Sequence, residues 1–459
     1  MVTSQAFATS TGPSAGTLVT PDDPGWDEAR QAWNLAVDQQ PAAVALPASA
    51  QDVVAVVDLA RESRLRVAPQ GTGHTAAPLG TLGDTIVLKT ERMRGIEIDP
   101  VGRIARAEGG VLWREAVEAA AKHGLAMLAG SSPDVGVVGY TLGGGMSWLG
   151  RKYGLSANNV EAVELVTADG RVRQVDRRHE PELFWALRGG GGSFGIVTAI
   201  ELRLFPITEV YAGLLWWPIE RGPEVLHAWR ELTHSGLPDE LTTVGRYLQL
   251  PSLPEIPEPV RGGSFVVVEV IHLGSSHEAD ELLAPLRALG PAMDTVETMP
   301  VEALSRLHMD PEQPVPVIGD GLMLADLPVD AIDELVRVAG ADAGSPLLSV
   351  ELRHLGGEFG RARPENGALA SVDGAYLFYA VGVTPTPEAA AAVDTHVELV
   401  KAAMAPWVAR HMYLNFADTS RDPSTFWTTE AYDRLRRIKA RVDPTDLIRS
   451  NHPVPPADQ

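Results

Sequence analysis

Hydrophobic and polar positions follow two different periods along the first 200 residues of the chain. An apolar stripe with helical spacing runs through residues 52–64 and again through 113–124, where Gly124 ends the pattern. Short apolar or alternating runs bounded by turn residues predict strands. These runs cover residues 65–70, 84–90, 95–100, 103–110, 162–172 and 195–206, with a further helix near 181–187.

From about residue 207 the pattern changes to long strand-like runs, between two amphipathic helices at 277–290 and 387–407. This combination is typical of an antiparallel sheet covered by helices on one face. After about residue 410 the pattern is irregular, with one helix over 431–442. The long strand-like runs occupy residues 212–219, 242–250, 264–274, 347–357 and 375–383.

The length of the chain favours more than one domain. Its 459 residues exceed the size at which a single hydrophobic core stops growing. We place one domain in residues 1–205 and 411–459, and a second in residues 206–410, which carries the predicted antiparallel sheet. The predicted fold class is α+β, and no internal repeat of fixed period is present.

Composition and charge exclude several classes of protein. The chain is 45% hydrophobic and 21% charged, as globular proteins are. Its net charge of −22 argues against nucleic acid or an anionic membrane as a partner. The absence of cysteine excludes disulfides, thiolate catalysis and cysteine-ligated metals.

We expect a cytoplasmic protein with a disordered N-terminal lead. The first residues lack the basic start and apolar core of a secretory signal. No run of 18 or more apolar residues is long enough for a transmembrane helix.

Four glycine-rich clusters carry the strongest chemical signal. They are residues 67–80 (VAPQGTGHTAAPLG), 129–145, 151–155 and 188–197. Each cluster alone reads as a set of turns that need positive φ. Four of them in one predicted domain instead indicate backbone N–H groups gathered around a pyrophosphate. The phosphate-binding loop Gly-Lys-Ser/Thr is absent, and no glycine pattern after a first strand favours a nicotinamide dinucleotide site.

In combination these clusters resemble motifs of the vanillyl-alcohol-oxidase-type flavoproteins. The specific resemblance is to the branch of berberine-bridge-enzyme-like and 6-hydroxy-D-nicotine-oxidase-like proteins. The loop Gln70-Gly71-Thr72-Gly73-His74 resembles the Gly-x-Gly-His loop of that branch, and residues 130–155 and 183–198 match its second and third motifs. The C-terminal family patterns stand at residues 413–418 (YLNFAD) and 443–451. The resemblance spans nearly the whole chain and implies the two-domain FAD-binding fold of this family.

The resemblance also implies a covalent cofactor. In this branch the loop histidine is bonded to the 8α carbon of FAD, which makes His74 the attachment residue and implies 8α-histidyl FAD. A neutral imidazole nitrogen can add to this electrophilic carbon, while the redox chemistry remains that of the flavin. The implied cofactor-contacting residues are Gln70, Gly71, Thr72, Gly73, His74, Thr75, Ser131, Ser132, Val135, Gly136, Gly139, Tyr140, Gly143, Gly144, Val197 and Asn451.

The chain departs from the family at several positions. Ser132 stands where many relatives carry a second linking cysteine, so we expect attachment through His74 only. Val135 occupies a position where valine goes with oxygen access, which implies an oxidase; an ordinary strand valine is the alternative. Phe416 replaces the catalytic tyrosine of plant members, and a glutamate position of those enzymes falls near Phe378.

The predicted strand LLSVELRHLGG offers substitutes for these missing bases. Period-two alternation puts Ser349, Glu351 and Arg353 on one face. Glu351 could be a base or an amine anchor, and Arg353 an anchor for an anion or carbonyl; a surface salt bridge is the alternative. Weaker candidates, which more often serve packing, are Tyr140, Tyr247, Tyr379 and Tyr413. The remaining histidines lack metal-ligand spacing, so we expect no metal.

The sequence therefore predicts an FAD-dependent oxidase. Hydride would pass from a C–H bond of a small organic molecule to the flavin, with O2 as acceptor and H2O2 as product. A flavin-dependent oxygenase or oxidative cyclase of a biosynthetic intermediate is one alternative, and a flavoprotein without turnover is another. Neither the substrate nor the oligomeric state is predicted, because the substrate domain carries the fewest recognisable motifs.

Overall fold

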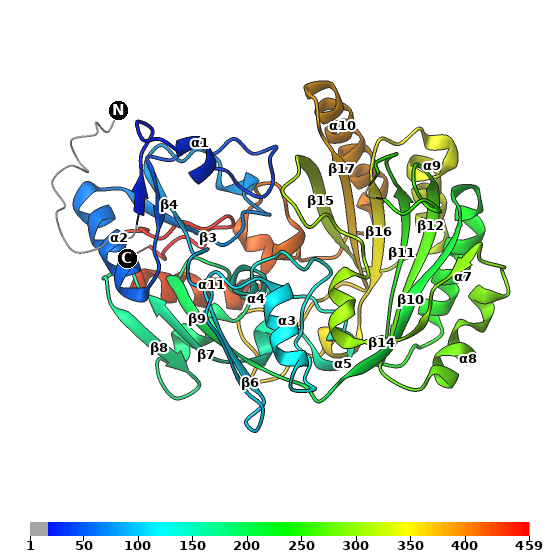
Figure 1. Cartoon of the computed structure of the whole chain (residues 1–459), viewed down its shortest axis with the longest axis horizontal. Coiled ribbons are helices and arrows are strands. Elements are labelled where there is room, and N and C mark those ends of the chain that lie inside the picture. The colour runs from blue at the N-terminus through cyan, green and yellow to red at the C-terminus, as the bar shows by residue number, and fades with distance from the viewer. Residues whose placement is uncertain (1–16, 255, 459) are drawn as a thin grey trace.

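A computed structural model describes residues 17–254 and 256–458; the N-terminal lead expected from the sequence lies mostly outside them. Three β-sheets organise the described chain (Figure 1). Two smaller sheets share the left-hand part of the view, and the large sheet with its helices fills the right-hand part. This mixed α+β arrangement agrees with the fold class expected from the sequence.

The first sheet has four strands and carries the first glycine-rich loop at its end. Helix α2 (Ala50–Ser63) covers it and begins at Ser49, whose side chain accepts a hydrogen bond from the Asp52 amide (3.2 Å). The helix buries Val53, Val56 and Val57 against the sheet. In sheet order the strands are β1 (Thr17–Val19), β2 (Ala43–Leu46), β4 (Thr85–Lys89) and β3 (Arg66–Gln70).

The second sheet has five antiparallel strands. Residues 162–172, expected as one strand with its turn, span parts of β7 and β8 and the turn between them, where Gly170 has a φ of +75°. In sheet order the strands are β5 (Ile96–Asp99), β6 (Ile104–Glu108), β9 (Ile196–Arg203), β7 (Val160–Val166) and β8 (Val172–Asp176). The helices of this part are α1 (Trp26–Ala29), α3 (Trp113–Ala121), α4 (Val137–Leu142), α5 (Gly150–Tyr153), α6 (Pro181–Leu187) and α11 (Thr429–Val442).

The third sheet has eight antiparallel strands and is covered by helices on one face (Figure 1). Its main path runs β13 (Met293–Asp294), β10 (Glu209–Pro218), β12 (Ser264–His272), β11 (Leu241–Gln249), β16 (Ser349–His354), β17 (Tyr376–Val383) and β15 (Val317–Leu324), and β14 (Glu297–Pro300) pairs with β10. The covering helices are α7 (Gly222–His234), α8 (Ser276–Arg287), α9 (Val329–Ala339) and α10 (Pro387–Met404).

The hydrophobic pattern did not predict all elements of this sheet. It indicated α8 and α10 but missed α7, α9, β13, β14 and β15. The sequence of β15, VIGDGLML, contains two glycines and Asp320, which are depleted in strands. The buried Asp320 carboxylate is satisfied by Lys401 (2.5 Å) and by Arg421, two residues far away in the sequence. Tertiary contacts therefore stabilise a strand that local propensity disfavours.

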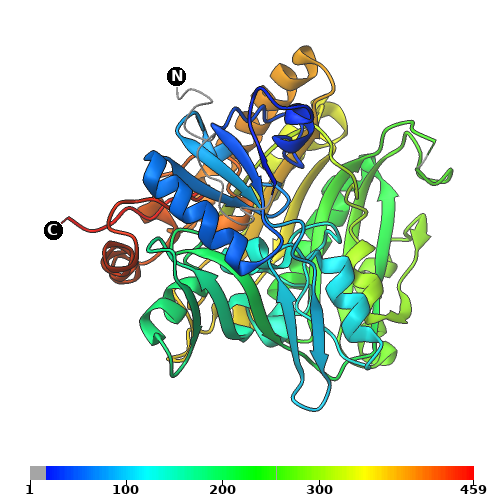
Figure 2. The ribbon, with the colours of Figure 1, turned by 60° about the vertical axis from the view of Figure 1, so that its left-hand side comes forward.

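The C-terminal segment returns to the first two sheets. Figure 2 shows it in red beside the blue strands, where Ile448 forms a parallel bridge with Val67 of β3. Lys439 of α11 is fully buried, and its ammonium group donates to the carbonyls of Ser193 (2.8 Å) and Ile448 (2.9 Å). It also pairs with the buried Asp443 at 2.6 Å. This one cation therefore joins the C-terminal segment to the glycine-rich loop that precedes β9.

We expect Lys439→Met to lower the free energy of unfolding by about 3–5 kcal/mol, because the substitution leaves the buried Asp443 carboxylate without its cation. Urea unfolding followed by tryptophan fluorescence measures this change. Lys122→Met, at an exposed position, is the matched control and should stay within about 0.5 kcal/mol of the wild type. Equal losses in the two variants would contradict this account of Lys439.

Candidate active site

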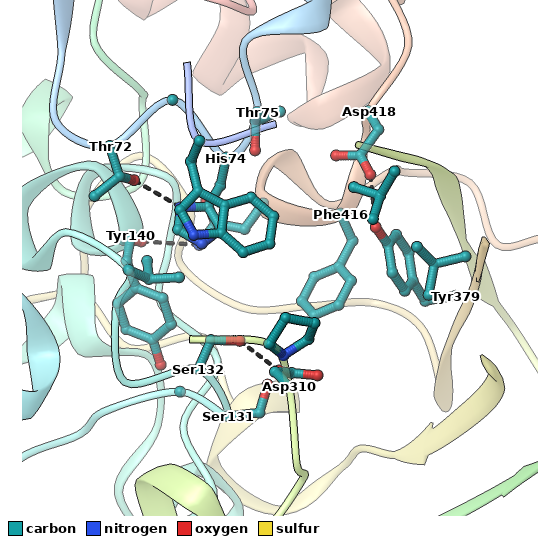
Figure 3. Close-up of a pocket in the computed structure, with 18 of the residues that line it drawn as sticks. Thr72, His74, Thr75, Ser131, Ser132, Tyr140, Asp310, Tyr379, Phe416 and Asp418 are labelled. Atoms are coloured by element: carbon teal, nitrogen blue, oxygen red, sulfur yellow. Dashed lines mark hydrogen bonds between the residues drawn. The ribbon is translucent and has the colours of Figure 1, made fainter. Parts of the chain in front are cut away.

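One large cavity lies between the glycine-rich loops and the uncovered face of the third sheet. Its volume of about 1150 Å³ exceeds the roughly 300–1,000 Å³ of ordinary ligand pockets. The walls come from residues 69–76, 130–146 and 191–197, from β11, β16 and β17, and from the C-terminal segment. Figure 3 shows His74 and Tyr140 facing Phe416 and Tyr379 across this space.

The glycines of the cavity wall fit a ligand that lies directly on the backbone. A Cβ atom added to Gly71, Gly136, Gly139 or Gly191 would meet nothing within 4 Å, although all four residues line the cavity. Their bare backbone therefore faces open space. This geometry suits FAD, whose pyrophosphate and ring can approach main-chain N–H groups that no side chain covers.

A glycine at position 143 serves a different purpose. A Cβ there would lie 1.7 Å from the Asn415 side-chain oxygen, so only glycine fits. Asn415, the central residue of the YLNFAD pattern, donates to the Tyr140 carbonyl (2.8 Å). This contact joins the second motif to the C-terminal segment at the cavity wall.

His74 lies in this wall within a close group of side chains (Figure 3). Its Nδ1 atom is 2.7 Å from the Thr72 hydroxyl oxygen. Its ring stacks on the indole of Trp33, with centroids 3.9 Å apart and planes at 17°. Its Nε2 atom is buried without a hydrogen-bond partner, 3.6 Å from a carboxylate oxygen of Asp134.

The loop at residues 130–136 faces the charged part of the cavity. Ser132 donates a hydrogen bond to Asp310, and Ser131 accepts one from Arg353 (3.4 Å). Val135 lines the cavity and is half-buried. The hydroxyl of Tyr140 is buried without a partner, and burial raises its pKa well above the usual value.

The structure brings nearly all predicted site residues to this one cavity. Gly144, Tyr413 and the weaker candidate Tyr247 are not among its lining residues, and Tyr247 lies in the helix-covered core. The Tyr413 ring packs against Gly144 in a buried cluster and stacks on Phe416. The cavity-lining members of the prediction are Gln70, Gly71, Thr72, Gly73, His74, Thr75, Ser131, Ser132, Val135, Gly136, Gly139, Tyr140, Gly143, Val197, Glu351, Arg353 and Asn451.

Strand β16 presents alternate side chains to the cavity, as its sequence pattern predicts. Ser349, Glu351 and Arg353 line the cavity, whereas Val350 and Leu352 belong to the core beneath the helices. The Glu351–Arg353 pair (3.0 Å) is almost fully buried, so it is not a surface salt bridge.

In the neighbouring strand β17, the cavity-facing residue is not Phe378, the position that the family resemblance suggested. Phe378 lies in the helix-covered core, and the cavity-facing residue is Tyr379, the cross-strand partner of Glu351.

A buried charge network surrounds Glu351. His308 lies 3.0 Å from the Glu351 carboxylate and 2.9 Å from the carboxylate of Glu269. Arg246 pairs with Glu269 at 2.7 Å. Arg246, Glu269 and Glu351 come from adjacent strands, as does Arg353, so opposite charges lie together within one small region of the sheet. Arg353 also lies over the rings of Phe416 (4.9 Å) and Trp148 (5.3 Å).

The network fixes the protonation of two residues. Burial and the charge of Arg246 act to lower the pKa of His308, but the carboxylates around it raise the pKa to about 9. Burial acts to raise the pKa of Glu351, but the charges of Arg353 and His308 outweigh it and hold the pKa well below its usual range. Glu351 is therefore an anion with little tendency to accept a proton, and His308 is a cation at neutral pH.

A second polar pair lies on the far side of Phe416. Tyr379 donates a hydrogen bond to Asp418 (2.7 Å), and both residues line the cavity (Figure 3). Burial, opposed by this hydrogen bond and assisted by the charge of Asp320, raises the pKa of Asp418 to about 7. Burial, together with the charge of Asp418, raises the pKa of Tyr379 well above its usual value.

Sequence analysis did not single out several of these residues as site residues, among them Asp310 and Asp418. Arg246 and Glu269 interrupt otherwise apolar strands, which is a usable signal for a polar function. Trp33, His308 and Asp310 lie in segments without regular alternation, where no local pattern could have identified them, whereas Asp134 and Asp418 lie inside matched family motifs.

Within the described residues, no group of three or more His, Asp or Glu side chains could hold a metal ion. No helix in the same part of the chain is long and apolar enough to cross a membrane.

We expect the stability contribution of His308 to depend on pH. Folding raises its pKa above the unfolded value of about 6.5, so its contribution is complete below that pH and is lost as pH rises through about 9. The difference in unfolding free energy between the wild type and His308→Gln should shrink by on the order of 3 kcal/mol between pH 6 and pH 10. Urea unfolding at several pH values measures it, with His123→Gln at an exposed position as control. A constant difference would contradict the charged state of His308.

Comparison with known proteins places this site in a family. A family model described as an FAD binding domain matches residues 41–176, and one described as berberine and berberine like matches residues 412–455. The sequence is 32% identical over 464 residues to the (R)-6-hydroxynicotine oxidase of Paenarthrobacter nicotinovorans, covering 96% of this chain and 97% of that protein.

Solved structures give the same assignment. The crystal structure of 6-hydroxy-D-nicotine oxidase from Arthrobacter nicotinovorans superposes with a TM-score of 0.83 at 27% identity, covering 98% of this chain and 100% of that one. BBE-like 1 of Physcomitrella patens has the same fold, with a TM-score of 0.84 at 19% identity and 99% of each chain covered. The chain therefore belongs to the berberine-bridge-enzyme-like branch of the vanillyl-alcohol-oxidase-type flavoproteins, and it is an FAD-linked oxidoreductase.

Proposed function

We propose that the protein is an oxidase of small organic molecules with FAD attached covalently through His74. When bound, FAD supplies the acceptor for a hydride from a substrate C–H bond and passes the electrons to O2, which gives H2O2. The observation that carries this proposal is the position of His74 in the wall of a single cavity, opposite a sheet face that bears acid and base groups.

The two sides of the cavity have separate roles in this proposal. The glycine-rich loops, with Thr72, Thr75, Ser131, Val197 and Asn451, would hold the cofactor on bare backbone. The uncovered face of the third sheet would bind the substrate. We also propose the domain division that follows from this separation, with residues 1–205 and 411–459 for FAD and residues 206–410 for substrate.

We assign the proton acceptor to the pair of Tyr379 and Asp418. A hydroxyl or ammonium proton of the substrate would move to the Tyr379 oxygen while the tyrosine proton moves to the Asp418 carboxylate. The 2.7 Å hydrogen bond and the exposure of both residues to the cavity support this assignment. Glu351, held as an anion by two cations, is better suited to bind a positive group than to take a proton. Arg353 keeps its predicted role as an anchor for an anion or carbonyl.

The part of the cavity next to the end of β11 favours a substrate with a large apolar part. Most lining residues at this end of the sheet are aliphatic, and they include Leu248, Leu250, Leu347 and Val383. An oligosaccharide would find few hydrogen-bond partners there. Since the relative in Paenarthrobacter nicotinovorans is named for 6-hydroxynicotine, we place amines with an apolar ring skeleton first among candidate substrates, followed by apolar alcohols.

A substrate screen with peroxide detection tests the proposed activity. Amines with apolar rings, apolar alcohols, phenols and sugars are each added to the purified protein in air, and H2O2 is measured. Peroxide from any donor supports an oxidase. Incorporation of labelled O2 into the product would instead identify an oxygenase, and a flavin that no donor reduces anaerobically would identify a protein without turnover.

We expect the flavin to stay with the protein chain after acid precipitation. His74→Ala should bind FAD but release it on denaturation, because the linking nitrogen is gone. Ser132→Ala should retain the flavin, because Ser132 bonds only to Asp310. Fluorescence of the precipitate and supernatant measures the two fractions, and free flavin from the wild type would overturn the covalent proposal.

We expect the rate of anaerobic flavin reduction to rise with pH through about 7, as Asp418 loses its proton and becomes able to accept one. Tyr379→Phe should lower this rate by roughly 10²–10⁴-fold, and Asp418→Asn should both lower it and flatten its pH profile. Stopped-flow absorbance with a substrate found in the screen measures the rate. If Glu351→Gln removed the pH dependence and Tyr379→Phe did not, the base would be Glu351.

A further inference from the structure

Asp134 has no role in the proposed hydride transfer, yet it is a buried acid beside His74. It is 5% exposed and lies in the loop at residues 130–136. One of its carboxylate oxygens accepts a hydrogen bond from the Trp33 indole (2.5 Å). The other has no hydrogen-bond partner and lies 3.6 Å from Nε2 of His74, which also has none. Two unpartnered buried polar atoms therefore face each other at slightly more than hydrogen-bond distance.

Trp33 fixes the geometry of this pair from a second direction. Its ring stacks on His74 with centroids 3.9 Å apart, and its backbone amide donates to the Thr72 carbonyl (2.9 Å). The same residue thus orients the imidazole ring and holds the carboxylate beside it. Among the described residues, Asp134 is the only acid within 4.0 Å of a ring nitrogen of His74.

Attachment of the imidazole to carbon places a specific demand on these neighbours. The attacking nitrogen must carry a lone pair, and the ring must lose the proton of its other nitrogen, or a positive charge stays in a buried site. A carboxylate at Nε2 favours the tautomer with its proton on Nε2 and leaves the lone pair on Nδ1. The Thr72 hydroxyl at Nδ1 can rotate away from that lone pair.

We propose that Asp134, held by Trp33, is the positioning residue that prepares His74 for covalent attachment of FAD and accepts its Nε2 proton. This inference rests on the proposed covalent linkage. The bond formed joins Nδ1 to the 8α carbon, and one C–H bond of the 8-methyl group is broken. Two protons leave, one from that carbon and one from Nε2, and two electrons pass through the flavin to O2, giving H2O2.

The proposal is tested by attachment and not by turnover. Full-length apoprotein is produced in flavin-depleted cells and incubated with FAD in air. The amount of flavin that resists denaturation is then followed over time by gel fluorescence and intact mass. We expect Asp134→Asn to bind FAD but to attach it at least roughly tenfold more slowly than the wild type. Trp33→Phe, which keeps the stacked ring and loses the indole N–H, should also slow attachment.

Asp373→Asn is the matched control, because Asp373 is likewise an acid paired with a histidine, His411 (2.6 Å), and neither residue lines the cavity. It should attach FAD at the wild-type rate. Asp134→Glu should recover part of the attachment rate lost in Asp134→Asn. If the asparagine variant fails to fold, the attachment rate of Asp134→Glu relative to the wild type tests the proposal instead.

The outcomes separate this inference from the proposed function. A wild type that never retains flavin would refute the covalent linkage itself. A wild type that attaches FAD, together with Asp134→Asn attaching it equally fast, would overturn the role of Asp134 alone. An Asp134→Asn variant that folds but binds no FAD at all would assign Asp134 to binding and would equally overturn its role in attachment.

Discussion

The alternation of side chains across the third sheet is the constraint on which the substrate side of the molecule depends. Because successive residues of a strand point to opposite faces, the side chains of β16 alternate between the hydrophobic core and the cavity. Val350 and Leu352 enter the core beneath the helices, and Glu351 and Arg353 enter the cavity. A shift of one residue would bury both charges among aliphatic side chains. The hydrophobic core under the helices therefore also holds the polar cavity face in register.

Charges brought to a buried face in this way must be neutralised locally. Isolated ions in a protein interior are unstable, whereas paired ions with hydrogen bonds are tolerated. The network around His308 meets this requirement with groups from adjacent strands and from the segment at residues 308–310. As a consequence, two acids of the cavity differ in protonation. Glu351 is locked as an anion, while Asp418, in a less compensated position, has a pKa of about 7 and can exchange a proton.

The opposite wall follows another physical rule. There the backbone faces the cavity directly, because glycines such as Gly71 and Gly136 carry no side chain to cover it. Among the side chains of this wall, His74 has close contacts with both Trp33 and Asp134. A glycine-rich wall and a charged sheet face thus lie across one cavity, an arrangement that suits a flavin enzyme, in which the protein positions both cofactor and substrate.

The sequence alone determined whatever depends on neighbouring residues. Helical and strand periods indicated most elements, glycine clusters indicated a cofactor wall around His74, and alternation placed Glu351 and Arg353 on one face. The tertiary structure alone decided which groups meet. Trp33 and Asp134 are 101 residues apart, and Tyr379 and Asp418 are 39 apart. It also decided the pKa values, since these depend on burial and on charges from distant strands. A local pattern reports the direction in which a side chain points, but only the folded chain determines what that side chain touches.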